Sequence, residues 1–194
     1  MNVDEQYSPE RVADRMAIQD VMYKWCRAID RLDSDGMRAA FHPDAIDSHG
    51  SFVGGVEGLV EWVQERHKPI PFSSHQVSNM LIEFATPDLA VVETYIRTLQ
   101  HYPADAKASL AQLSGGAEGK PGVGIDLMTS SRYVDRFERR NGQWRIARRT
   151  LVQDWKHLLE VSGEPPKPKE GWYVGRRDKQ DFIYIERAAL GIKD

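Results

Sequence analysis

A long β-hairpin constrains the fold of this chain more than any other feature of its sequence. Residues 125–140 and 143–155 are two segments of alternating apolar and polar side chains, and Asn141-Gly142 lies between them. Asn-Gly fits a two-residue turn between antiparallel strands, because both positions tolerate a positive φ. The sequence therefore predicts two long antiparallel strands joined at Asn141-Gly142.

A second pair of strands precedes this hairpin. Residues 76–84 and 89–102 are rich in β-branched and aromatic side chains, and residues 86–88 supply a turn between them. One face of the later strand carries Glu93, Tyr95, Arg97 and His101. Because this face is more polar than a plain core requires, we expect it to line a cavity.

Three helices are expected before these strands. Residues 12–31 form the first, Asp33-Ser34 opens a short second helix that His42-Pro43-Asp44 ends, and Gly54-Gly55 opens the third. Residues 45–53 read as a short strand. The glycine-rich stretch 103–124 matches neither a P-loop nor a dinucleotide-binding fingerprint, so we expect a mobile connection over a cavity mouth. The aromatic tail from residue 158 should pack on the domain or on a neighbouring subunit.

Composition limits the classes of protein to consider. With 194 residues and 41% hydrophobic content, the chain fits one well-buried domain with a tail. A net charge of −3 gives no basic field for nucleic acid. No apolar stretch approaches the roughly 20 residues that span a bilayer, and no signal peptide is recognisable, so we expect a cytoplasmic protein without membrane contact. The single cysteine, Cys26, lies among apolar residues and reads as a buried structural thiol.

The first helix carries a carboxylate at the edge of its apolar face. Apolar residues recur along it at three- and four-residue steps, and Asp30 lies just beside this stripe, on nearly the same line as Tyr23. A carboxylate in that position is costly unless another group pairs with it. From the residues alone, Asp30 either caps a turn, pairs with Arg27 or Arg31, or meets a partner from elsewhere in the chain.

A group of metal-ligand types lies near the end of the second helix: His42, Asp44, Asp47 and His49. Pro43 interrupts the group, and its members straddle a helix end and a turn without the spacing of a zinc site. We expect a turn followed by an edge strand, with no metal and no organic cofactor.

Three motifs in this order resemble the SnoaL-like branch of the nuclear transport factor 2-like superfamily. They are Phe41-His42-Pro43-Asp44-Ala45, Ser74-His75-Gln76-Val77-Ser78-Asn79, and the hairpin around Asn141-Gly142. The resemblance implies an α+β fold, a cone-shaped barrel of three N-terminal helices packed on a strongly curved, mostly antiparallel sheet. It implies a domain over residues 1–157 and an ordered C-terminal extension over 158–194. The fold hosts many activities, so it does not by itself fix one.

The dehydratase-lyase members of that branch include scytalone dehydratase, bile-acid dehydratase, hexachlorocyclohexane dehydrochlorinase and the formaldehyde-releasing diarylpropane lyase. The first three imply an Asp-His pair, formed here by Asp30 and His75. A carboxylate that accepts one ring N–H leaves the other ring nitrogen free to act as a base. This chain has Trp25 where relatives place a tyrosine or lysine, so the proton donor is open, with Tyr23 as a candidate. The catalytic set we expect is His75, Asp30, Tyr23 and Arg132. The substrate-binding set is Trp25, Asn79, Tyr95, Arg97, His101 and Tyr133.

The function this implies is that of a cofactor-independent lyase in aromatic-compound catabolism. It would eliminate water or formaldehyde from a hydroxylated, hydrophobic aromatic or polycyclic substrate, and we expect a homo-oligomer, a dimer or trimer. Two alternatives stay open. One is a non-catalytic binding or assembly module resembling the β subunit of a ring-hydroxylating dioxygenase, and the other is a cyclase or isomerase of the same fold.

Overall fold

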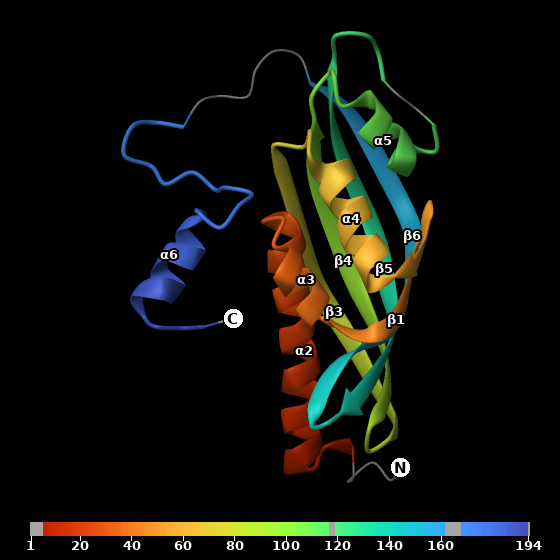
Figure 1. The fold of residues 1–194 in the computed structure, drawn as a ribbon. Coiled ribbons are helices and arrows are strands. Elements are labelled where there is room, and N and C mark those ends of the chain that lie inside the picture. Colours follow the sequence, from red (N-terminus) through yellow and green to blue (C-terminus); the bar gives the residue numbers. More distant parts are fainter. Residues whose placement is uncertain (1–5, 117–118, 162–167, 194) are drawn as a thin grey trace.

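A computed structural model describes residues 6–116, 119–161 and 168–193 as helices packed on one curved sheet (Figure 1). The prediction of an α+β fold with three N-terminal helices on a mostly antiparallel sheet is confirmed. The elements are α2 (Pro9–Asp30), α3 (Ser34–Ala39), β1 (Phe41–His49), β2 (Phe52–Gly55), α4 (Val56–His67), β3 (Phe72–Thr86), β4 (Leu89–Tyr102), α5 (Lys107–Ser114), β5 (Gly124–Arg140), β6 (Gln143–Val161) and α6 (Phe182–Ala189).

The sheet has six strands in the order β2-β1-β6-β5-β4-β3. Strand β1 runs parallel to β6, and the other neighbours are antiparallel. Strands β1 and β3 are thus separated by three strands within the sheet. They can face one interior only because the sheet twists and curves.

Local signals explain where the helices begin. The Ser8 side chain accepts a hydrogen bond from the Arg11 backbone N–H, and Pro9 follows in the first turn, so α2 begins three residues before the predicted start. Asp33 caps α3 by accepting from the Gly36 N–H at 3.2 Å. The inner face of α2 buries Ile18, Met22, Trp25 and Ile29 in the main core. That packing fixes the C-terminal end of α2, and hence Asp30, against the sheet.

Two predicted boundaries are wrong. The second helix ends at Ala39, and Phe41, His42, Pro43 and Asp44 already belong to β1. Pro43 is tolerated there because the pairing of β1 with β6 is irregular between Phe41 and Ile46. The expected connection 103–124 contains a helix, α5, whose Leu110 packs with Ile70 and Tyr102 in a second apolar cluster.

The hairpin prediction is confirmed. Asn141 and Gly142 adopt φ values of 52° and 75°, and Arg140 pairs with Gln143 across the turn. Strand β6 extends past the predicted residue 155 to Val161, where it pairs with Gly124. Strands β5 and β6 contribute Thr129, Ser131, Tyr133, Leu151 and Gln153 to the lining of the interior cavity.

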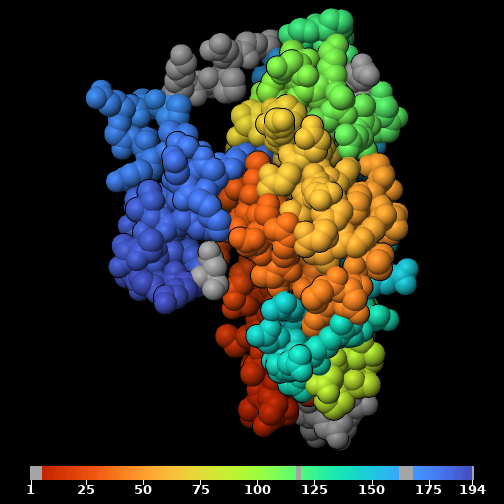
Figure 2. All heavy atoms as spheres, in the orientation of Figure 1, coloured from red at the N-terminus to blue at the C-terminus, as the bar shows by residue number. Residues whose placement is uncertain are grey.

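The described part of the C-terminal extension, residues 168–193, contacts the helical end of the domain (Figure 2). The Arg177 guanidinium donates to the backbone carbonyls of Asp30 at 2.9 Å, Ile29 at 3.2 Å and Ile70 at 2.8 Å. It therefore caps the last turn of α2, the turn that carries Asp30. Among the residues described, no helix is both long and apolar enough to cross a bilayer.

We predict that Asp33→Asn loosens the C-terminal extension. Asp33 accepts from Lys179 Nζ at 2.6 Å and from the Tyr184 hydroxyl at 3.0 Å. Burial acts to raise the pKa of Asp33, but hydrogen bonds from Lys179, Gly36 and Tyr184 outweigh it and lower that pKa below its usual range. Asparagine keeps the α3 cap and removes the charge. Hydrogen exchange of residues 176–190 at neutral pH should therefore become faster in the variant.

The same contact predicts a pH dependence in the wild type. The pKa of Asp33 is lower in the folded than in the unfolded chain. The contribution of ionised Asp33 to stability is therefore complete above the unfolded pKa of about 3.9, and it is lost as the pH falls through the pKa of Asp33 in the folded chain. Exchange in residues 176–190 should accelerate selectively at acid pH. Asp35→Asn, which changes an exposed carboxylate two residues further along the chain, is the control, and equal exchange in all three proteins would contradict the contact.

Candidate active site

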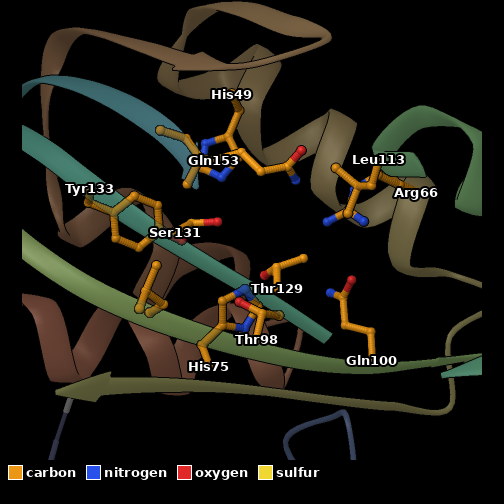
Figure 3. A pocket seen from close by; sticks show the side chains of 12 residues that line it. His49, Arg66, His75, Thr98, Gln100, Leu113, Thr129, Ser131, Tyr133 and Gln153 are labelled. Atoms are coloured by element: carbon orange, nitrogen blue, oxygen red, sulfur yellow. The ribbon is translucent and has the colours of Figure 1, made fainter. Parts of the chain in front are cut away.

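An interior cavity lies between the curved sheet, α4 and α5 (Figure 3). It holds about 430 Å³ of empty space when the open space at its mouth is included, but its enclosed part is only about 40 Å³, well below the roughly 300–1,000 Å³ usual for small-molecule sites. Nine of the twelve lining residues carry a polar side-chain group, although apolar atoms make up slightly more of the exposed lining. The lining residues are His49, Arg66, His75, Ile96, Thr98, Gln100, Leu113, Thr129, Ser131, Tyr133, Leu151 and Gln153.

Asp30 and His75 meet at one wall of this cavity. His75 Nδ1 lies 2.7 Å from Asp30 Oδ1, and the His75 backbone N–H donates to Asp30 Oδ2 at 2.9 Å. The Ser73 hydroxyl donates to Oδ1 at 3.1 Å. Because an ionised carboxylate only accepts, this arrangement holds the His75 proton on Nδ1. Within the described chain, His75 Nε2 has no hydrogen-bond partner, so its lone pair is free for a ligand.

A second Asp-His pair lines the same cavity from β1. Asp47 and His49 lie two residues apart on one face of the strand, with His49 Nδ1 2.9 Å from Asp47 Oδ1. Asp47 is buried, and its Oδ2 has no partner among the described residues. Figure 3 shows His49 and His75 on opposite walls, the one from β1 and the other from β3. Two imidazoles, each oriented by a carboxylate, therefore face one space.

Arg66 brings a positive charge to the cavity from the last turn of α4. Its Nη1 donates to the Tyr102 hydroxyl at 3.0 Å, and its Nη2 contacts His67 Nε2. The guanidinium carbon lies 4.9 Å from the centre of the Trp62 ring. Burial, together with Arg66 and Arg177, holds the pKa of His67 well below its usual value, so His67 is neutral.

Beneath the cavity lies a fully buried ion pair. Arg149 donates to both carboxylate oxygens of Asp135, at 2.8 and 2.7 Å. Its guanidinium carbon lies 3.9 Å from the centre of the Tyr133 ring and 5.0 Å from that of Trp25. Tyr133 lines the cavity, as expected for a ligand-binding residue. Trp25 is fully buried below it and donates to the Tyr133 hydroxyl at 3.5 Å, so it supports the wall without lining it.

The polar face of β4 lines a second, outer groove and not this interior cavity. The residues that reach the cavity from β4 are Ile96, Thr98 and Gln100, on the other face. Tyr95, Arg97 and Asn79 line a separate outer groove, and His101 pairs with Asp126 at 2.7 Å outside the cavity. The outer face is the more charged one, whereas the inner face becomes polar through short uncharged side chains.

Two residues of the expected catalytic set also lie outside the cavity. Tyr23 is on the same line of α2 as Asp30, but seven residues at 1.5 Å each separate them by about 10 Å, and Tyr23 is 53% exposed. Arg132 points from the outer face of β5, where it is bound by Glu93 at 2.6 Å and Asp154 at 2.9 Å. The spacing along the helix axis and the strand alternation explain these two corrections.

Sequence reasoning missed His49, Arg66 and the polar inner face. The signal for the inner face was the recurrence of Thr98, Gln100, Thr129, Ser131 and Gln153 at alternate positions of otherwise apolar strand faces. His49 was considered only as a metal ligand, and β1 lies between β2 and β6, not at an edge. No local signal separates Arg66 from a surface arginine at a helix end.

The group considered as a metal site is dispersed. His42 Nε2 bonds the Glu138 carbonyl at 2.9 Å, and Asp44 pairs with Arg140 at 2.6 Å, while Asp47 and His49 pair with each other. Across residues 6–116, 119–161 and 168–193, no three His, Cys, Asp or Glu side chains cluster as metal ligands would. Burial raises the pKa of Cys26 to about 12, so its thiol is not a nucleophile near neutral pH.

Comparisons with known proteins give matches of sequence family and of fold. A family model described as a SnoaL-like domain matches residues 10–150. A protein of Novosphingobium aromaticivorans, provisionally named scytalone dehydratase, shares 19% identity with a TM-score of 0.62 over 82% of this chain and 97% of its own. Hexachlorocyclohexane dehydrochlorinase from Novosphingobium barchaimii shares 19% identity with a TM-score of 0.62 over 82% of this chain and 98% of its own.

A third solved structure, provisionally named an aromatic ring hydroxylase, is also from Novosphingobium aromaticivorans. It shares 21% identity with a TM-score of 0.59 over 77% of this chain and 94% of its own. No curated protein matches the sequence significantly. At these identities the solved structures show a shared fold.

Proposed function

The chain belongs to the SnoaL-like family of the nuclear transport factor 2-like superfamily, and from that premise we propose that it is a cofactor-independent lyase that eliminates water or formaldehyde from a small hydroxylated substrate. The observation that carries the proposal is the Asp30–His75 pair at the cavity wall, with Nδ1 and Oδ1 2.7 Å apart. A base held in one tautomer and facing a cavity is what proton abstraction from carbon requires.

In this proposal His75 is the base and His49 the acid. His75 Nε2 takes a proton from carbon, and the electrons of the broken C–H bond form the C=C bond. The C–O bond breaks with its electrons on oxygen, which takes a proton from His49 Nε2 and leaves as water. Asp30 and Asp47 each hold the Nδ1 proton of their histidine, at 2.7 and 2.9 Å. Solvent then returns the proton from His75 to His49.

Loss of formaldehyde would use the same pair on a hydroxymethyl group. His75 takes the hydroxyl proton, the C–O bond becomes C=O, and the adjoining C–C bond breaks. Its electrons form a new C=C bond and expel a leaving group that accepts the His49 proton. In both reactions His75 acts as the base and His49 as the acid.

The cavity favours a compact, oxygen-bearing substrate over a polycyclic hydrocarbon. Of the aromatic residues expected to bind substrate, only Tyr133 lines the cavity, and most other lining groups are hydroxyl, amide, imidazole or guanidinium. The enclosed space is small, about 40 Å³, so a polycyclic compound would not fit unless the lining side chains rearrange. We therefore narrow the expected substrate to a small hydroxylated compound.

Mass spectrometry of the protein incubated with hydroxylated one-ring and two-ring compounds tests the function. The expected result is a product lighter by one water, or by one formaldehyde together with the protonated leaving group, formed by the wild type and not without protein. The panel includes a hydroxymethyl compound to separate the two losses. Turnover by another route, or no turnover of any member, would count against a lyase.

His49→Gln is expected to lower kcat by about 10²-fold or more for a hydroxyl leaving group, because glutamine cannot deliver the proton. A substrate that loses chloride needs no such proton, so its kcat should fall much less. Comparing the two leaving groups in wild type and variant measures the acid role directly. Equal losses for both would assign His49 to cavity shape alone.

A further inference from the structure

Arg66 is a buried cation without a counter-ion in the described chain. Its side chain is 5% exposed, and no carboxylate oxygen of the described residues lies within 4.0 Å of it. The other buried arginine of the described chain differs in this respect, because Arg149 has the carboxylate of Asp135 at 2.7 Å. Leaving a guanidinium buried and unpaired is costly. An anionic ligand that binds at the cavity wall would supply the missing counter-charge and offset this cost.

The surroundings of Arg66 orient its guanidinium and leave donors free. The Tyr102 hydroxyl accepts from Nη1 and donates a hydrogen bond to Gln100 Oε1 at 2.7 Å, while His67 contacts Nη2. Trp62 covers one face. An arginine has five N–H groups, so three remain without a partner among the described residues, Nε–H included. Every neighbour that holds the group is uncharged.

The charges around the cavity are distributed unevenly. The carboxylates of Asp30 and Asp47 lie behind His75 and His49, where each is bound to its histidine. Arg66 and Arg177 both contact His67, which is neutral. Figure 3 shows Arg66 beside Gln100 and Thr129, on the side of the cavity away from His49 and Tyr133. An anionic group would be favoured at the Arg66 side and repelled by the carboxylates at the other.

We propose that Arg66 forms an anion subsite and that the substrate of this cavity is a hydroxylated carboxylic acid whose carboxylate binds Arg66. A planar carboxylate matches the two-pronged guanidinium, and such charge-assisted bonds are stronger than neutral ones. The reacting carbons then lie between His75 and His49. This assignment rests on the proposed function for its reaction, but the binding preference it predicts does not depend on turnover.

Binding of acids and their neutral amides tests the subsite. Benzoate with benzamide and trans-cinnamate with cinnamamide are titrated by calorimetry into the wild-type protein. A hydrogen bond to a charged group contributes about 1.5–3 kcal/mol, so at least one acid should bind about 10-fold or more tighter than its amide. In Arg66→Gln that preference should disappear while amide affinity stays within about 3-fold, and Arg66→Lys should retain part of it.

Arg136→Gln removes an exposed guanidinium of the outer face and should leave the preference unchanged. The wild-type comparison needs no variant to fold, and thermal melts of both Arg66 variants establish that they do. Equal binding of acid and amide, a preference that survives Arg66→Gln, or no binding by any acid overturns the proposal. Titrations of His75→Ala test the anion subsite separately from the lyase function, because this variant should lose turnover but keep the preference for acids over amides. Lyase turnover of neutral substrates alone would leave the function standing and remove the subsite.

Discussion

Replacing His75 by alanine is expected to lower kcat/KM by about 10²–10⁴-fold, because a positioned base contributes that much to a proton transfer. Its ring is the one whose Nδ1 proton Asp30 holds at 2.7 Å while Nε2 faces the cavity. Asp30→Asn should reduce the rate in the same direction, since an amide can hold the wrong tautomer. Initial rates on the substrate identified by mass spectrometry measure both effects.

The chain supplies a matched control for this experiment. His101 also has its Nδ1 2.7 Å from a carboxylate, that of Asp126, but it lies outside the cavity. His101→Ala removes the same chemical pair and should leave kcat/KM close to that of the wild type. If His101→Ala and His75→Ala lose activity equally, the losses reflect stability, and His75 is not the base.

Removing one member of the Asp135–Arg149 pair is expected to destabilise the protein by about 3–5 kcal/mol. Both side chains are 0% exposed, and asparagine at position 135 would leave the guanidinium buried without its counter-ion. Most of the lost stability would come from burying the unpaired Arg149 charge, and less from losing the attraction between the two side chains. The free energy of unfolding from denaturant titration of Asp135→Asn measures it.

A double replacement separates these two contributions. Asp135→Leu combined with Arg149→Met removes both charges and keeps apolar volume against Tyr133 and Trp25, so it should recover most of the stability lost in the single variant. Asp20→Asn, which breaks an exposed pair with Lys24 at 3.6 Å, should change little. A double variant no more stable than Asp135→Asn would mean that the pair itself stabilises the fold.

The order of helices and strands could be predicted from the sequence because each depends on local chemistry. Asn141-Gly142 fixes its turn through two positive φ values, and Asp33 fixes a helix start through one side-chain hydrogen bond. The start of β1 could not be predicted in this way. Phe41 continues the apolar side of the second helix in the sequence, and only pairing with β6, far along the chain, turns it into a strand.

The site was predictable where family motifs placed residues and unpredictable where a face had to be chosen. The resemblance brought Asp30 and His75 together, and the structure places them 2.7 Å apart. The alternation of side chains along β4 defines two faces, and from the sequence the charged face, with Arg97, is expected to line the cavity. Thr98 and Gln100 pass for core in a sequence, because short uncharged side chains tolerate burial when hydrogen-bonded. Arg66 depends on the tertiary position of α4, which no local pattern specifies.

The parallel pairing of β1 with β6 also bears on how the site forms in time. Asp47 pairs with Arg149, about 100 residues further along the chain, whereas the β5–β6 hairpin closes locally. Contacts of such separation require a large loss of chain entropy before they gain energy, and they form slowly. His49 reaches the cavity only when this last long-range pairing is made. A partly folded chain that holds α2 and strands β3 to β6 would therefore contain Asp30 and His75 but lack the opposite wall, so ligand binding reports completed folding.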